Sequence, residues 1–227
     1  MNSTPPEPSY RSNSSPLLRI WHWSNLLVIM GSLTTVLLAK TILKTKNNVA
    51  LVQSNLQANQ VTVTSDQAKS VAHDFNDLAW NWHVFLGYTL SALLLLRILY
   101  ELFRPKQQRL ISLLKKTLKY IKIPATEKGR AKHYLFVKST YLSFYLTLFL
   151  QACTGLFMAY SDGKDDLKPL RHNASDIHSV LMWVILGFIA IHIAGVIRAE
   201  FTHENKGIVS DMINGGENKC KPPSNRS

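Results

Sequence analysis

The sequence predicts an all-α membrane protein, a bundle of four transmembrane helices. Four segments contain no Lys, Arg, Asp or Glu, namely Ile20–Ala39, Leu78–Leu96, Ser139–Ser161 and Ile177–Ile197. They are 20, 19, 23 and 21 residues long, and roughly 20 helical residues cross a hydrocarbon core of about 30 Å. A backbone in lipid must satisfy its own hydrogen bonds, so such runs cross as helices. Soluble helices rarely stay charge-free over this length four times, which disfavours a soluble all-α protein.

The spans divide the chain into a core and two tails. We expect spans at about 18–40, 78–103, 136–160 and 177–199, within a membrane domain covering residues 17–201. Residues 1–16 are rich in Pro, Ser and Asn and predict a disordered leader, and residues 202–227 predict a flexible tail. The loop from about Lys40 to Asp77 is polar and fits either an external cap that receives a partner or a flexible spacer.

The basic residues are distributed unevenly between the two sides of the predicted bundle. The N-terminal segment, the second loop and the C-terminal tail hold 17 Lys and Arg, whereas the first and third loops hold 7. Because basic residues stay cytoplasmic, we expect both termini and the second loop in the cytoplasm. The net charge of +12 is then explained by topology and lipid contact, without a nucleic-acid partner.

The second loop contains an amphipathic segment, Gln107–Ile123. Leu110, Leu114, Leu118 and Ile121 fall on one helical face, and most of the lysines fall elsewhere. This pattern is typical of a short cytoplasmic helix lying in an anionic headgroup layer. A solvated basic linker helix is the alternative.

Four of the eight histidines lie in or at the ends of the apolar runs. His22 and His192 lie toward the predicted cytoplasmic side, and His83 and His178 lie toward the outside. His178 and His192 are 14 residues apart in one run, so they share a helical face at a separation of about 21 Å. Depth therefore predicts two pairs, one near each membrane surface.

Imidazoles inside a membrane indicate function, because burying an ionisable group there is unfavourable. Two facing imidazoles complete a six-coordinate haem. A di-metal site would need ligands clustered around one point, with carboxylates or thiolates, and none of the four runs contains an acidic residue. We therefore predict an inner haem iron held by His22 and His192 and an outer haem iron held by His83 and His178. No Cys-x-x-Cys-His occurs, so both haems are expected to be non-covalent haem b.

Two arginines are candidate partners for haem propionates. Arg19 precedes His22 by three positions, and Arg97 follows His83 by 14 positions. Both are expected at the cytoplasmic level, near the inner haem. For Arg97, an alternative is snorkelling to lipid phosphate.

The motifs together resemble a known family. The sequence RIWHW at Arg19–Trp23, the span NWHVFLGYTLSALLLLRILYELF, the Thr154–Gly155 dipeptide and the pattern His178-x13-His192 look like the bacterial cytochrome b561 and hydrogenase-type cytochrome b superfamily. The resemblance covers roughly residues 17–201. It implies a four-helix di-haem bundle in the bacterial inner membrane that exchanges electrons with quinone, with haem ligation at the same four histidines. The longer first loop and the position of His133 depart from compact members of the family.

We therefore expect a respiratory-chain electron carrier between the quinone pool and a redox protein, either as a separate electron-transfer protein or as a subunit of a quinone-linked oxidoreductase. One alternative passes electrons to or from a small molecule such as ferric iron or superoxide, without a protein partner. Another is a haem-free sensor or transporter that uses the histidines for protons or metal. The expected partners are membrane lipid, quinone and a redox protein, with a homodimer left open.

The charge distribution makes a prediction about topology. Reporter fusions at Ser227 and within residues 40–77 should report opposite compartments, with Ser227 in the cytoplasm, because 17 of the basic residues lie on its side. Finding both fusions in one compartment would mean that a span has been miscounted.

Overall fold

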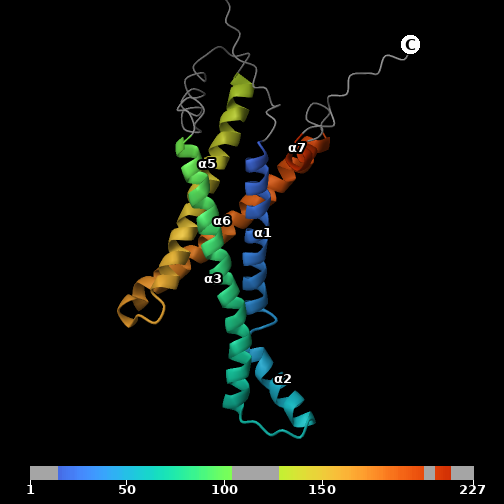
Figure 1. Cartoon of the computed structure of the whole chain (residues 1–227), viewed down its shortest axis with the longest axis vertical. Coiled ribbons are helices and arrows are strands. Elements are labelled where there is room, and N and C mark those ends of the chain that lie inside the picture. The colour runs from blue at the N-terminus through green and yellow to red at the C-terminus, as the bar shows by residue number, and fades with distance from the viewer. Residues whose placement is uncertain (1–14, 104–127, 202–207, 216–227) are drawn as a thin grey trace, which may run out of the picture. The chain divides into compact units, whose positions relative to one another are not determined.

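A computed structural model describes residues 15–103, 128–201 and 208–215. The predicted amphipathic helix Gln107–Ile123 and the leader before Ser15 lie outside the described residues. Within the described residues all regular structure is helical (Figure 1). The elements are α1 (Pro16–Lys40), α2 (Thr45–Ala58), α3 (Ser65–Phe103), α5 (Lys128–Tyr160), the 3₁₀ helix η2 (Asp165–Leu167), α6 (Lys168–Phe201) and α7 (Ile208–Asn214).

Four helical segments are long and apolar enough to cross a membrane: Pro16–Lys40, Ser65–Phe103, Ser139–Tyr160 and Asp165–Phe201. Three of them contain a predicted span, and Ser139–Tyr160 covers all but the first three residues of the span predicted at 136–160. Many large apolar side chains on them are exposed, for example Leu27 at 72% and Trp183 at 68%. Monomeric soluble proteins rarely expose apolar surface on this scale, whereas lipid tails cover it. These helices therefore confirm the four predicted spans.

The internal contacts divide the chain into two compact units. The central unit comprises residues 25–186, and the terminal unit comprises residues 1–24 together with 187–227. Helices α1 and α6 each contribute one part to each unit.

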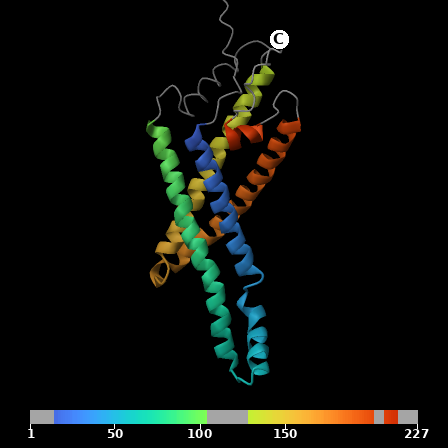
Figure 2. The same cartoon turned by 45° about the vertical axis from the view of Figure 1, so that its right-hand side comes forward.

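In the central unit, the first loop forms a helical hairpin. Helix α2 lies alongside the first half of α3, as Figures 1 and 2 both show. Thr64 and Gln67 start α3 with a capping box, in which the Thr64 N–H donates to Gln67 Oε1 (2.9 Å) and the Gln67 N–H donates to Thr64 Oγ1 (3.2 Å). Ala68 and Ala72 are buried at 1% and 0% exposure, and their small side chains allow a close approach of α3 to its neighbour. Of the two alternatives for this loop, the flexible spacer is therefore disfavoured.

The end of α1 is fastened to α3 by Asn76. Its Nδ2 donates to the carbonyl oxygens of Ala39 (2.8 Å) and Leu43 (3.0 Å). These carbonyls lie where α1 ends and its last C=O groups lack helical partners. Trp80 Nε1 in turn donates to Asn76 Oδ1 at 3.0 Å. The side chain of Asn76 thus sets the register of α3 against α1, one turn before Trp80 and two turns before His83 on the same helix.

A tight turn joins α5 to α6. Gly163 has φ +71°, a left-handed conformation that suits glycine. Ser161 is completely buried, and its Oγ donates to the carbonyl of Met158 at 3.2 Å. Asp162 and Arg171 form an ion pair across the turn. These contacts determine where α6 begins.

In the terminal unit, α7 ends against the beginning of α1. Helix α1 starts at Pro16, a favoured first helical residue, directly after Ser15. Arg19 Nη1 donates to the carbonyl of Ile213 at 3.2 Å, and Trp23 Nε1 donates to the carbonyl of Met212 at 3.1 Å. Arg19 and Trp23 thus satisfy carbonyls that the last turn of α7 leaves without helical partners. Part of the segment predicted as a flexible tail is therefore helical and contacts α1.

The Asn76 contacts predict a loss of stability on substitution. Asn76→Ala removes two hydrogen bonds to part-buried carbonyls and should lower the free energy of unfolding by roughly 1–3 kcal/mol. Asn59→Ala is the matched control, because Asn59 Nδ2 makes one exposed bond to the Asn55 carbonyl. Unfolding in detergent followed by circular dichroism would measure both, and equal effects would contradict the role given to Asn76.

Candidate functional site

In the central unit, His83 of α3 lies opposite His178 of α6. Their ring centroids are 6.3 Å apart, with an angle of 79° between the ring planes. Both side chains are half-buried. Trp80, one turn before His83, contacts its ring edge-on at a centroid distance of 5.6 Å. Both helices are apolar enough to cross a membrane, so the two imidazoles form a polar site between them.

The terminal unit repeats the arrangement with different helices. His22 of α1 and His192 of α6 have ring centroids 6.3 Å apart, with an interplanar angle of 62°. Trp23 contacts His22 edge-on at 5.6 Å, and Phe188 stacks on His192 at 5.9 Å with an interplanar angle of 7°. The two pairs brought together are the pairs expected from depth in the sequence. Helix α6 contributes one histidine to each.

The spacing within each pair fits a single metal ion between the two rings. Metal–imidazole bonds are about 2.0 Å long, and each ring centroid lies about 1 Å behind its nitrogen, so two imidazoles on one metal have centroids about 6 Å apart. Both pairs measure 6.3 Å. Two neutral imidazoles without carboxylate or thiolate are the axial set of a six-coordinate haem iron. Both donor sets therefore fit haem.

Glycines border the rings in two ways. A Cβ added at Gly155 would lie 3.1 Å from Cε1 of His178, so the absence of a side chain at Gly155 makes room for the ring. A Cβ at Gly87 or at Gly195 would meet no atom within 4 Å. Both of these glycines therefore leave open space beside the helix, into which a flat macrocycle could fit.

Hydroxyl groups surround the imidazoles of the central unit. Ser32 Oγ and Thr35 Oγ1 of α1 each lie 3.2 Å from His83 Nδ1. Thr154 Oγ1 of α5 lies 3.0 Å from His178 Nδ1. Sequence reasoning named Thr154 only through the family resemblance and missed Ser32 and Thr35. The signal available for them was the hydroxyl cluster within the apolar run at Ile20–Ala39.

The two arginines predicted to meet propionates have protein partners. Arg19 Nη1 binds the carbonyl of Ile213 at the end of α7, while its Nε is buried without a hydrogen bond to any described residue. Arg97 Nε donates to the hydroxyl of Tyr145 at 3.3 Å, and Arg97 Nη1 lies 3.7 Å from Glu101. Their contact with a propionate stays a prediction. His133 belongs to α5, but its side chain lies outside the described part of the structure.

The comparison with known families identifies the group of proteins to which the chain belongs. The family model described as prokaryotic cytochrome b561 matches residues 13–215, which includes all four histidines and both arginines. The chain belongs to the prokaryotic cytochrome b561 family. No curated protein and no solved structure matches it.

Membership in the cytochrome b561 family carries three consequences. The protein binds b-type haem, transfers electrons, and spans a membrane several times through the apolar helices described above. This finding disfavours the haem-free sensor or transporter.

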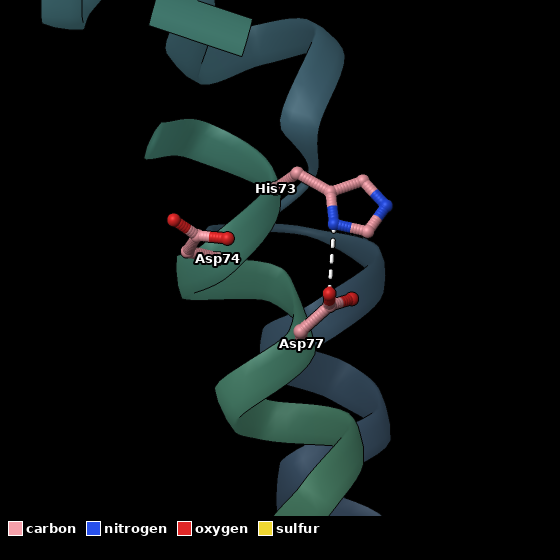
Figure 3. A group of neighbouring side chains, drawn as sticks. All are labelled: His73, Asp74 and Asp77. Atoms are coloured by element: carbon pink, nitrogen blue, oxygen red, sulfur yellow. Dashed lines mark ion pairs between the residues drawn. The ribbon is translucent and has the colours of Figure 1, made fainter. Parts of the chain in front are cut away.

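Within the described residues, one further group of side chains could hold a metal ion, and it is unlike the imidazole pairs. His73, Asp74 and Asp77 lie on one stretch of α3 in the hairpin, with ligand atoms within 4.8 Å of one another (Figure 3). His73 Nδ1 already pairs with Asp77 at 2.8 Å, and these two side chains are 62% and 50% exposed. An exposed ion pair of this kind needs no metal to explain it.

Proposed function

We propose that this cytochrome b561 family member holds two b-type haems and transfers electrons across the bacterial inner membrane between the quinone pool and a redox protein. The observation that supports this most is the presence of two separate imidazole pairs with the same centroid distance of 6.3 Å. Each unit contains one complete axial ligand set. His22 and His192 would ligate one haem, and His83 and His178 would ligate the other.

The protein supplies position and environment, and haem supplies one-electron redox chemistry. Helix α6 contributes one ligand to each pair. Helices α1 and α3 supply the facing imidazoles. Apolar side chains on the same helices exclude water. The reduction potential of each iron then depends mainly on its ligands and the few groups next to them.

The unequal distribution of basic residues supports an orientation with cytoplasmic termini. His22 and His192 then serve an inner haem, and His83 and His178 serve an outer one. In this orientation, Arg19 would offer its buried Nε to the inner haem's propionates. Arg97 is assigned to the same propionates by its sequence level alone.

The α2–α3 hairpin is the surface that we assign to the external redox partner. It is an ordered extension of α3 rather than a flexible connection, and it exposes apolar side chains among polar ones. Leu51 of α2 and Phe75 of α3 are 55% and 54% exposed. Interfaces between proteins use apolar side chains in a polar rim in this way. Reconstitution with quinol, with and without a soluble redox protein, would separate this function from direct reaction with ferric iron or superoxide.

Haem stoichiometry is the first test of the proposal. The purified protein should contain two haems per chain, and acid-acetone should extract both because no covalent attachment motif exists. A pyridine haemochrome assay against protein concentration gives the ratio. A ratio near one or near zero would overturn the di-haem assignment.

The assignment of ligands is tested by four single substitutions. His83→Ala and His178→Ala should each remove or perturb one and the same haem, and His22→Ala and His192→Ala should do so for the other haem, because each pair shares one iron. Potentiometry and absorption spectra should therefore sort the four variants into two classes of two.

The matched controls are His73→Ala and His172→Ala, whose side chains are 62% and 79% exposed and pair with aspartates on α3 and α6. Both controls should retain two unaltered haems. If His22→Ala behaved like His83→Ala or His178→Ala, the pairing would be wrong.

A further inference from the structure

The Nδ1 atom of His83 faces one carbonyl oxygen and two hydroxyl groups. The Ser32 carbonyl oxygen lies 3.2 Å away and has no proton to give. Thr35 Oγ1, also at 3.2 Å, donates its single proton to that same carbonyl at 2.7 Å, so toward the imidazole it offers only lone pairs. Ser32 Oγ, at 3.2 Å, can accept as well. Because the carbonyl can only accept, we assign the proton of the neutral imidazole to Nδ1 of His83.

The His178 imidazole contacts Thr154 and also hydrogen-bonds to the Gln151 carbonyl, which can only accept. Thr154 Oγ1 lies 2.9 Å from the Leu150 carbonyl and 3.0 Å from the Gln151 carbonyl, and its one proton is directed to these two acceptors. It lies 3.0 Å from His178 Nδ1. The hydroxyl must accept from an Nδ1–H, because its own proton is already used. In both rings the lone pair then belongs to Nε2.

The other pair lacks this arrangement. Among the residues that the structure describes, no hydrogen bond reaches a ring nitrogen of His22 or His192. Their neighbours are aromatic, with Trp23 edge-on to His22 and Phe188 stacked on His192. The hydroxyl contacts thus distinguish one pair from the other.

We propose that Thr35 and Thr154 are positioning residues for the haem between His83 and His178, fixing both imidazoles as Nδ1–H tautomers with Nε2 free for iron and lowering the reduction potential of that haem alone. This rests on the proposed di-haem function. An imidazole that donates its Nδ1–H becomes a more basic ligand through Nε2. A more basic ligand stabilises ferric over ferrous iron, and second-shell hydrogen bonding is one of the levers by which proteins set haem potentials.

The test replaces each hydroxyl by a methyl group of the same shape. Thr154→Val removes the one hydroxyl acceptor at His178, where the Gln151 carbonyl remains, and Thr35→Val removes one of two hydroxyl acceptors at His83. At a fixed potential, Thr154→Val should increase the reduced-to-oxidised ratio of that haem about three- to tenfold, which is a rise of about 30–60 mV for one electron. Thr35→Val should give a smaller rise, since both the carbonyl and the hydroxyl of Ser32 still accept from His83.

The chain offers a matched control for each substitution. Thr34 neighbours Thr35 on α1, and its Oγ1 bonds the Met30 carbonyl at 2.8 Å without reaching an imidazole. Thr147 lies on α5 with Thr154, and its Oγ1 bonds the Ser143 carbonyl at 2.9 Å. Thr34→Val and Thr147→Val should leave both potentials unchanged. Thr154→Ser keeps the hydroxyl and should restore the native potential.

Potentiometry of purified two-haem protein, monitored by absorption, measures both haems at once, and the haem of His22 and His192 serves as an internal reference. A rise confined to the His83/His178 haem supports the proposal, and so does loss of that haem in Thr154→Val with recovery in Thr154→Ser. Unchanged potentials, equal shifts in both haems, or shifts as large in Thr147→Val would overturn it. A wild-type protein without two haems would instead overturn the proposed function.

Discussion

Pairs of imidazoles held opposite each other between different helices constrain the rest of this structure. Each pair joins residues far apart in the chain, 22 with 192 and 83 with 178, at the same centroid distance of 6.3 Å. The histidines are polar groups in segments that must otherwise be apolar, so each ring has to turn toward another helix rather than toward lipid. The helices that bear the rings approach closely enough in both places to give the same centroid distance.

On the opposite side of each helix, the surface that does not bear a histidine must be apolar. Large side chains such as Leu27 and Trp183 are mostly exposed, in positions where lipid tails would surround them. Hydroxyl groups on the spanning helices donate back to the carbonyl one turn earlier, as Thr34 and Thr147 do, which removes an unpaired donor from the apolar layer. Thr154 uses the same local bond. What sets it apart is that its remaining lone pairs face His178.

Outside the apolar layer, helix α3 continues for several turns and pairs with α2. The capping box at Thr64 and the small buried side chains of Ala68 and Ala72 give this extension a defined start and a close contact. Asn76 then transmits its position to the end of α1. The hairpin includes the first half of the helix that bears His83, so the surface that we propose for a redox partner and a proposed haem ligand belong to the same helix.

The sequence by itself determined the four spans, the family and the grouping of the histidines by depth. These properties depend on run length and position along the chain, which hydropathy and helical rise report directly. The rotation of each helix about its axis and the identity of its neighbours depend on packing, which a one-dimensional pattern does not contain. For that reason only the tertiary structure showed that Ser32 and Thr35 of α1 contact His83 and that Thr154 contacts His178. It also showed that Arg19 donates a hydrogen bond to a carbonyl at the end of α7.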